Sequence, residues 1–305
     1  MEYKNIVTQL HTIPPPQQPW ISCAMSHYDE KFVDWNPICI ENRALYYQFM
    51  TDKSANHYID ILPDACINIL FKCSENEPSA VVSGIYEGCS KMPLEPSTTY
   101  FGFKPYSVVG MKNMKAGFRE LKNNTVDFGH VFDDISIIDR IALAPNLNER
   151  IKLFQNYAMS NLVNEKYIPD FIEYCTILIY LSGGNIGLEE IERETGYSER
   201  YCREKFKEIY GVSIKHYSRI VRFQNALRMI TKGELEGISD IVYEAGYFDQ
   251  SHFINEFKRF TLTSPAKFRN AYMNLMANHE VANEAKFPAG RTTASIKNTI
   301  RDCSR

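Results

Sequence analysis

Two stretches of the chain carry side chains whose types and spacing suit contacts with nucleic acid. The first set, on one predicted helix, is Ser198, Arg200, Tyr201, Arg203 and Lys207. The second set, on another predicted helix, is Gln250, Ser251, His252, Asn255 and Arg259. Guanidinium and ammonium groups bind phosphates, and amide, imidazole and guanidinium groups read base edges in a major groove. Either set alone is also typical of a solvated helix face, so the elements that carry the two sets decide the interpretation.

The starts and the buried faces of these two helices can be predicted. Ser198 and Asp249 are of the residue types that cap helix N-termini. After each cap, apolar residues recur at helical spacing and predict a face turned toward a core. These residues are Cys202, Phe206 and Ile209 in the first helix and Phe253, Phe257 and Phe260 in the second. The two polar sets then lie on the outward faces.

The same pattern occurs twice in this part of the chain, which indicates an internal duplication. Gly196 recurs as Gly246 at an offset of 50 residues, and Phe206 recurs as Phe257 at an offset of 51. One residue is therefore inserted after the second glycine. Each copy predicts a short helix, a glycine turn and a longer amphipathic helix, which is the helix-turn-helix layout.

Residues 214–231, between the two copies, have the pattern of one amphipathic helix. At about 1.5 Å per residue, a helix of about 18–20 residues spans roughly 30 Å. One turn of B-DNA advances about 34 Å. The spacing therefore predicts two recognition helices in successive major grooves of one duplex.

The charge distribution supports a local contact with DNA. The whole chain has a net charge of −3, so no overall positive field attracts nucleic acid. Residues 195–232, however, contain nine basic and three acidic residues, and residues 257–270 contain four basic and no acidic residues. Most acidic residues of this region lie elsewhere, in the short first helix of each copy and in the turn before the second copy: Glu189, Glu190, Glu192, Glu194, Glu234, Glu236, Asp240 and Glu244. We therefore expect a surface divided into a basic and an acidic part, since phosphate contacts supply much of the affinity for DNA.

An ordered series of motifs runs from residue 198 to residue 269. The motifs are Ser198-Glu199-Arg200-Tyr201, Phe206-Lys207-Glu208, Gly211-Val212-Ser213, Arg222-x-x-x-Ala226-Leu227, Ala245-Gly246-Tyr247-Phe248-Asp249-Gln250-Ser251-His252-Phe253, Phe257-Lys258-Arg259-Phe260 and Ser264-Pro265-x-x-Phe268-Arg269. With them, residues 170–270 resemble the AraC-type (AraC/XylS) family of bacterial transcription regulators. The resemblance implies a bipartite helix-turn-helix domain that binds double-stranded promoter DNA. It further implies RNA polymerase as a partner and the role of an activator, but these residues do not distinguish activation from repression.

Four positions depart from the family pattern. Glu204 and Asn255 stand where family members often carry an arginine on the recognition helices. Glu192 replaces a small buried residue, and Leu262 replaces a glycine at a turn. A carboxylate at position 204 would repel phosphate or accept a hydrogen bond from cytosine. The scaffold therefore matches the family better than the reading surface does.

The N-terminal half is predicted to be rich in strands. Short alternating or β-rich runs occupy residues 58–62, 66–71, 80–85, 98–103 and 107–111. Pro63-Asp64 between the first two runs has the composition of a turn, and one helix is expected near residues 114–121. Residues 62–71 are similar to a strand-turn-strand element in one subgroup of the family. The order of domains implies that this half senses either a small-molecule effector or a partner and sets the formation of a homodimer.

A helical region joins the two halves. Asn146 and Glu149 have the spacing of a helix start, and an apolar stripe from Leu147 to Leu162 predicts either a connector or a dimer-forming helix. A further helix is expected from Pro169 to Leu181. We therefore predict an α+β chain with an N-terminal arm (1–19), a β-rich domain ending in connector helices (20–164), a bipartite helix-turn-helix domain (165–274) and a flexible tail (275–305).

Composition and missing motifs exclude several classes of function. The chain has 305 residues, of which 44% are hydrophobic and 23% charged, as in globular proteins. No stretch of 18 apolar residues occurs and the first residues are too polar for a secretory signal, so we expect a cytoplasmic protein without a membrane contact. The eight cysteines form no CxxC pair. We find no phosphate-binding loop, nucleophile elbow or zinc-protease motif, and expect no catalytic residue, metal or cofactor.

Two alternative functions stay open. Glu204 and Asn255, with the lack of net basic charge, favour a regulator that keeps the fold but binds another protein. The number of cysteines alone suggests an enzyme that uses Cys66 or Cys73 as a nucleophile. The 13% of aromatic residues could line a pocket in the N-terminal half or form an ordinary core there.

Overall fold

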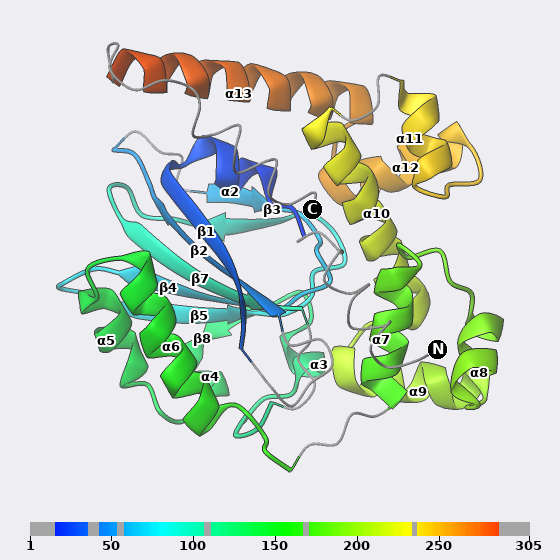
Figure 1. Ribbon diagram of the computed structural model, residues 1–305, viewed down its shortest axis with the longest axis horizontal. Coiled ribbons are helices and arrows are strands. Elements are labelled where there is room, and N and C mark those ends of the chain that lie inside the picture. The colour runs from blue at the N-terminus through cyan, green and yellow to red at the C-terminus, as the bar shows by residue number, and fades with distance from the viewer. Residues whose placement is uncertain are drawn as a thin grey trace.

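The structure is a computed structural model that describes residues 16–35, 43–53, 58–106, 111–166, 171–233 and 237–286. An antiparallel sheet with helices on both faces makes up the N-terminal half, and helices alone make up the C-terminal half (Figure 1). The predicted α+β class and the order of the two halves are confirmed. Among the described residues, no helix is both long enough and apolar enough to cross a membrane.

The main sheet has the strand order β1-β2-β7-β4-β5-β8, and every neighbouring pair is antiparallel. Its strands are β1 (Ser26–Asp34), β2 (Arg43–Met50), β4 (Asn68–Cys73), β5 (Ser79–Ser83), β7 (Thr99–Pro105) and β8 (Thr125–Asp127). A second sheet pairs β3 (Tyr58–Ile61) with β6 (Ser90–Pro93). Four of the predicted runs are therefore strands β3, β4, β5 and β7. The fifth, 107–111, falls mostly on residues outside the described part.

Side chains alternate between the two faces of the main sheet along each strand. Each face packs against other elements, so both faces contribute to a core. Tyr46, Phe71 and Phe101 belong to the core on one face. Tyr47 and Leu70, their neighbours in the chain, belong to the core on the other face. The short helix α2 (Pro19–Ala24) packs on this second face, since Ile21 lies in the same core. Most of the predicted N-terminal arm (1–19) lies outside the described residues. Its last residue, Pro19, begins α2 and is of a type that suits the first helical turn.

The other face is covered by α4 (Phe128–Val131), α5 (Ile137–Leu143) and α6 (Leu147–Asn161) (Figure 1). The helix start at Asn146 is confirmed, since its side chain accepts a hydrogen bond from the Glu149 amide. The apolar stripe of α6 is buried on the sheet, with the Phe154 ring 4.5 Å from that of Phe103. The stripe is therefore not a free dimer-forming face. Its apolar spacing reflects docking within the chain.

The C-terminal half consists of helices. They are α7 (Phe171–Leu181), α8 (Leu188–Thr195), α9 (Glu199–Tyr210), α10 (Ile214–Lys232), α11 (Ile238–Glu244), α12 (Gln250–Thr261) and α13 (Pro265–Lys286). Helix α13 extends past the predicted boundary at residue 274, so residues 275–286 are helical and not a flexible tail. No glycine or proline interrupts the sequence between Pro265 and Pro288, which explains the extension.

The two halves share one continuous core. Leu62, Ile85 and Tyr106 of the N-terminal half pack with Tyr180 and Tyr217 of the C-terminal half. The short helix α3 (Phe118–Leu121) contacts α9, and α2 contacts α13 (Figure 1). At this second contact, the ring of Trp20 lies 4.9 Å from the ring of Phe268.

Candidate nucleic-acid interface

Helix α9 presents the first predicted set to solvent. Ser198 caps the helix by accepting a hydrogen bond from the Tyr201 amide, and Cys202, Phe206 and Tyr210 are buried beneath it. Ile209, expected inside, is only half-buried. The exposed residues of the helix and its cap include Ser198, Arg200, Tyr201, Arg203 and Lys207. The first predicted set therefore lies on the solvent-exposed face of α9, as expected from the sequence.

The two arginines of this face form ion pairs with acidic residues of the same helix. Arg200 Nε lies 3.1 Å from a carboxylate oxygen of Glu204, and an Arg203 guanidinium nitrogen lies 2.6 Å from Glu199. Exposed pairs of this kind contribute only about 0.3–0.5 kcal/mol and are screened by salt. The carboxylate of Glu204, which departs from the family pattern, is thus paired with Arg200 and is not an isolated negative charge.

Tyr201 is part of an aromatic cluster at the start of α9. Its ring stacks on that of Tyr197 at 4.8 Å, and both rings contact the edge of Phe171 from α7. Tyr197 and Tyr201 remain partly exposed. The cluster fixes the turn before α9, and its exposed rings face the same solvent as the arginines.

Helix α12 presents the second predicted set. The Asp249 side chain accepts a hydrogen bond of 2.7 Å from the His252 amide, which confirms the cap. Phe253, Phe257 and Phe260 are fully buried, as predicted. The five residues of the set, Gln250, Ser251, His252, Asn255 and Arg259, are all exposed. Phe248, just before the cap, is also almost fully exposed, but it is not one of the predicted DNA-contacting residues.

A buried carboxylate, which was not identified from the sequence, attaches α12 to α10. The Glu256 side chain is 1% exposed and accepts hydrogen bonds from Arg219 and Arg222, whose side chains are 23% and 16% exposed. The guanidinium of Arg222 also lies 4.6 Å from the centre of the Tyr247 ring. These two arginines, counted above as part of a basic surface, are therefore partly neutralised and mainly structural. Their partner lies 34 residues or more away in sequence, so local patterns could not reveal the pairing.

The turns of the two units use left-handed backbone conformations. Gly196 has φ 72° and Gly246 has φ 74°, a region that glycine adopts without steric cost. At the end of α12, Leu262 has φ 61°. A leucine there is strained, because its Cβ crowds the following carbonyl. The structure thus confirms that Leu262 occupies a turn where glycine would fit better.

We expect Leu262→Gly to stabilise the chain by about 0.5–1 kcal/mol, which is the relief of left-handed strain less the backbone entropy of glycine. Little packing is lost, because Leu262 is 74% exposed. Denaturant unfolding followed by circular dichroism measures the change. Leu262→Ala is the matched control: it removes the same side chain but keeps the Cβ, so it should give no gain. Equal gains in both variants would contradict the strain argument.

Helix α10 connects the two units and contacts both recognition helices. In Figure 1, α9 lies below α10 and α12 lies beside its upper part. The helix has 19 residues, or about 28 Å at 1.5 Å per residue, close to the predicted length. The ten predicted site residues therefore form two separate exposed surfaces held by one rigid element.

The cysteines of the N-terminal half whose side chains the structure describes, Cys66, Cys73 and Cys89, have the properties of structural residues. Cys66 is buried, with its Sγ 3.9 Å from the hydroxyl of Tyr180. Burial raises the pKa of Cys73, and it raises the pKa of Cys89 to about 11. A thiol with a raised pKa is a poor nucleophile at neutral pH. This argues against the hypothesis of a cysteine enzyme. Among the described residues, no group of three His, Cys, Asp or Glu could hold a metal ion.

Comparison with known proteins identifies the helical region. Residues 191–271 match the family described as a helix-turn-helix domain. Uncharacterized HTH-type transcriptional regulators of Staphylococcus aureus are 24% identical over 126 residues, which is 41% of this chain and only 16% of those proteins. The HTH-type transcriptional activator RhaR of Pectobacterium carotovorum is 32% identical over 79 residues, which cover 26% of this chain and 28% of that protein.

Solved structures also match parts of the chain. ToxT from Vibrio cholerae has 14% sequence identity and a TM-score of 0.41, covering 79% of this chain and 97% of ToxT. A probable AraC family transcriptional regulator from Rhodopseudomonas palustris has 20% identity and a TM-score of 0.28, covering 33% of this chain and 93% of that chain. Because these TM-scores are below 0.5, the assignment depends on the sequence match and on the two capped, duplicated units. Residues 191–271 of this chain form a helix-turn-helix domain.

Proposed function

We propose that this protein is a transcription regulator that binds promoter DNA through α9 and α12. The observation that carries the proposal is the pair of capped helices, each with a buried aromatic face and an exposed polar face, mounted on α10. The two exposed faces carry the donors that contact phosphates and base edges. We infer that each enters one of two successive major grooves.

The test is a mobility-shift assay of the full chain with the DNA upstream of its own gene, at several salt concentrations. We expect binding that weakens steeply with salt, because phosphate contacts release counterions. No salt-sensitive binding to this or any genomic fragment would overturn the proposal. Footprinting of the bound fragment should show two protected segments about one helical turn apart.

Three substitutions test which residues contact the DNA. We expect Arg200→Ala, Arg203→Ala and Arg259→Ala each to weaken binding roughly 5- to 150-fold, the equivalent of about 1–3 kcal/mol for one contact. Arg193→Ala is the matched control: Arg193 is also exposed and also paired with an acidic residue, but it lies on the scaffold helix α8. Affinity equal to the control in all three variants would show that the DNA contacts lie elsewhere.

One observation favours a second candidate, a regulator that binds another protein through the same surface. Arg200 and Arg203 are each paired with a carboxylate of α9, so this face offers less free positive charge than its arginines suggest. If this candidate holds, a pull-down with the full chain should retain a protein and no DNA. Retention of DNA lost on adding salt would exclude it.

We further propose that the N-terminal half controls the DNA-binding half by binding a small-molecule effector. A cavity of about 190 Å³ lies between α2 and the main sheet, lined by Gln18, Ile21, Tyr28, Tyr47 and Lys104 among others. Its lining combines apolar side chains such as Ile21 with the charged groups of Glu30 and Lys104, and such polar groups fix the orientation of a small ligand in a concave site. RNA polymerase and a second copy of the chain are the other partners that this role implies, and both stay predictions.

A further inference from the structure

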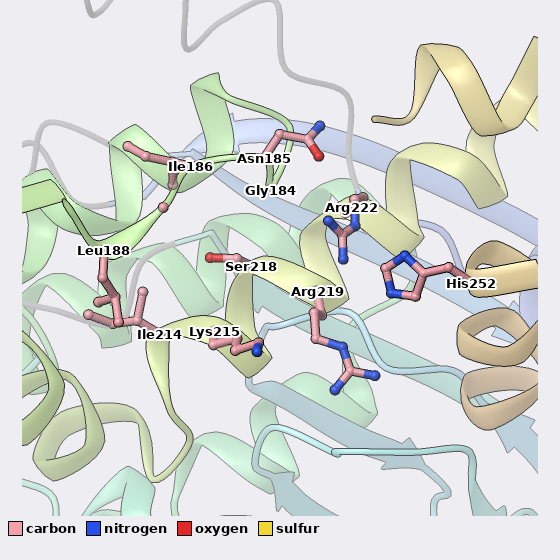
Figure 2. Close-up of a pocket in the computed structure, with 11 residues that line it drawn as sticks. Gly184, Asn185, Ile186, Leu188, Ile214, Lys215, Ser218, Arg219, Arg222 and His252 are labelled. Atoms are coloured by element: carbon pink, nitrogen blue, oxygen red, sulfur yellow. The ribbon is translucent and has the colours of Figure 1, made fainter. Parts of the chain in front are cut away.

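A cavity of about 570 Å³ lies at the junction of the two units (Figure 2). Three parts of the chain form its walls. They are the segment 184–188, which leads into α8, the first half of α10, and His252 in the first turn of α12. His252 belongs to the predicted reading surface. The cavity therefore opens beside the start of the second recognition helix, between the parts of the chain proposed to enter the two grooves.

The walls of the cavity are fixed relative to one another. The Asn185 side chain donates a hydrogen bond of 3.2 Å to the carbonyl of Ala245, in the turn of the second unit. Gly184 lies so close to α10 that an added Cβ would be 2.2 Å from the carbonyl oxygen of Ser218. Only a residue without a side chain fits there. The cavity is thus a preformed feature of the domain.

Basic side chains line one wall. Lys215, Arg219 and Arg222 lie on one side of α10 and border the cavity (Figure 2). Arg219 and Arg222 share the carboxylate of Glu256, whereas Lys215 has no ion-pair partner among the described residues. Three cations against one carboxylate leave an excess of two positive charges. The residues that line the cavity include no acidic residue.

Two buried donors in the same wall lack partners. Among the described residues, the hydroxyl of Ser218 and Nε of Arg222 have no hydrogen-bond acceptor, and Ser218 is 5% exposed. A buried donor without an acceptor lowers the stability of the folded chain, so native proteins rarely leave one without a reason. A ligand that brings oxygen acceptors into the cavity would remove this cost. Ammonium, guanidinium and hydroxyl donors together are a set that binds phosphate.

We propose that this cavity binds a phosphate group, and that in the DNA complex the group is a phosphodiester of the backbone between the two half-sites. The second part rests on the proposed function. A duplex that presents successive major grooves to α9 and α12 must carry the intervening backbone past α10. His252, one of the proposed DNA contacts, lines the cavity, and we therefore place the cavity on that route. It would fix the register of the duplex without reading sequence.

Two variants test the site in the full chain. Lys215→Ala should lower DNA affinity about 5- to 10-fold and reduce the slope of log affinity against log salt by about 1, equally for specific and unrelated DNA. Ser218→Ala removes a donor but no charge, so affinity should fall while the slope stays unchanged. Lys152→Ala is the matched control, because Lys152 is an exposed lysine of α6 in the other half. Thermal unfolding should be the same for Lys215→Ala, Lys152→Ala and the unsubstituted chain.

A neutral methylphosphonate placed midway between the two footprinted segments tests the contact directly. It should weaken binding of the unsubstituted chain and leave binding of Lys215→Ala unchanged, because that variant has already lost the contact. If Lys215→Ala binds DNA with unchanged affinity and slope, the phosphate site is wrong while the proposed function stands.

Calorimetric titration with inorganic phosphate separates a backbone phosphate from a free one. If the chain binds no DNA but binds phosphate, and Lys215→Ala does not, the site is supported for a free anion and its DNA role is overturned. If the chain binds neither DNA nor phosphate, the whole proposal is overturned together with the proposed function.

Discussion

Replacing Glu256 by glutamine is expected to destabilise the second helix-turn-helix unit by about 3 kcal/mol. The carboxylate is 1% exposed and forms ion pairs with two arginines of α10. An amide of the same size leaves those cations without their counter-charge, and breaking a buried ion pair in this way typically costs about 3–5 kcal/mol. We expect the lower end of the range, because Arg219 and Arg222 keep some contact with water. Denaturant unfolding of the full chain measures the loss.

The functional consequence is specific to the second unit. Without Glu256, α12 loses its fixed position on α10, so footprinting should show protection of one half-site only. Glu204→Gln is the matched control: it removes an acidic residue from the other recognition helix, but Glu204 is exposed and its pair with Arg200 is weak. We expect a stability change below about 0.5 kcal/mol there. Equal losses in the two variants would show that the buried carboxylate has no special role.

Glu256 also marks the limit of what the sequence could predict. The starts of α9 and α12 were predictable, because Ser198 and Asp249 bond to amides three residues away. Their buried faces were predictable from helical spacing. Glu256, in contrast, lies among the buried residues of α12, and its partners Arg219 and Arg222 lie on α10. A pattern of exposed and buried positions cannot pair charges across such a distance.

The same distinction holds in the N-terminal half. The turn at Pro63-Asp64 was predicted, and an Asp64 carboxylate oxygen does accept a hydrogen bond of 3.1 Å from the Cys66 amide. Its contacts with the rest of the chain were not predictable: the Gln224 side chain of α10 donates a hydrogen bond of 2.6 Å to the Pro63 carbonyl, 161 residues away. The stripe of α6 was predicted as apolar, but only the fold shows that it packs on the sheet.

This turn is the site of the second large expected effect, from Asp64→Asn. The Asp64 carboxylate accepts hydrogen bonds from the buried ammonium of Lys104 and from the Gln18 side chain. Asparagine leaves Lys104 buried without a counter-charge, so we expect a loss of about 3–5 kcal/mol in unfolding free energy. Asp60→Asn is the matched control, since Asp60 is an exposed acidic residue four positions away. It should change stability by less than about 0.5 kcal/mol.

The pH dependence of this loss tests its cause. Burial is the strongest single influence on Lys104 and lowers its pKa, but Tyr47, Cys66 and above all the hydrogen-bonded charge of Asp64 together outweigh burial and raise the pKa above the ordinary 10.5. Without that charge, burial should bring the pKa below 10.5, so between the two values the unfolded chain binds more protons than the folded variant. Stability of the variant then rises with pH in this window. The stability gap between the unsubstituted chain and Asp64→Asn should therefore narrow as the pH approaches 10.5. A gap that stays constant from pH 7 to 10.5 would mean that the loss comes from packing or hydrogen bonding and not from the unpaired charge of Lys104.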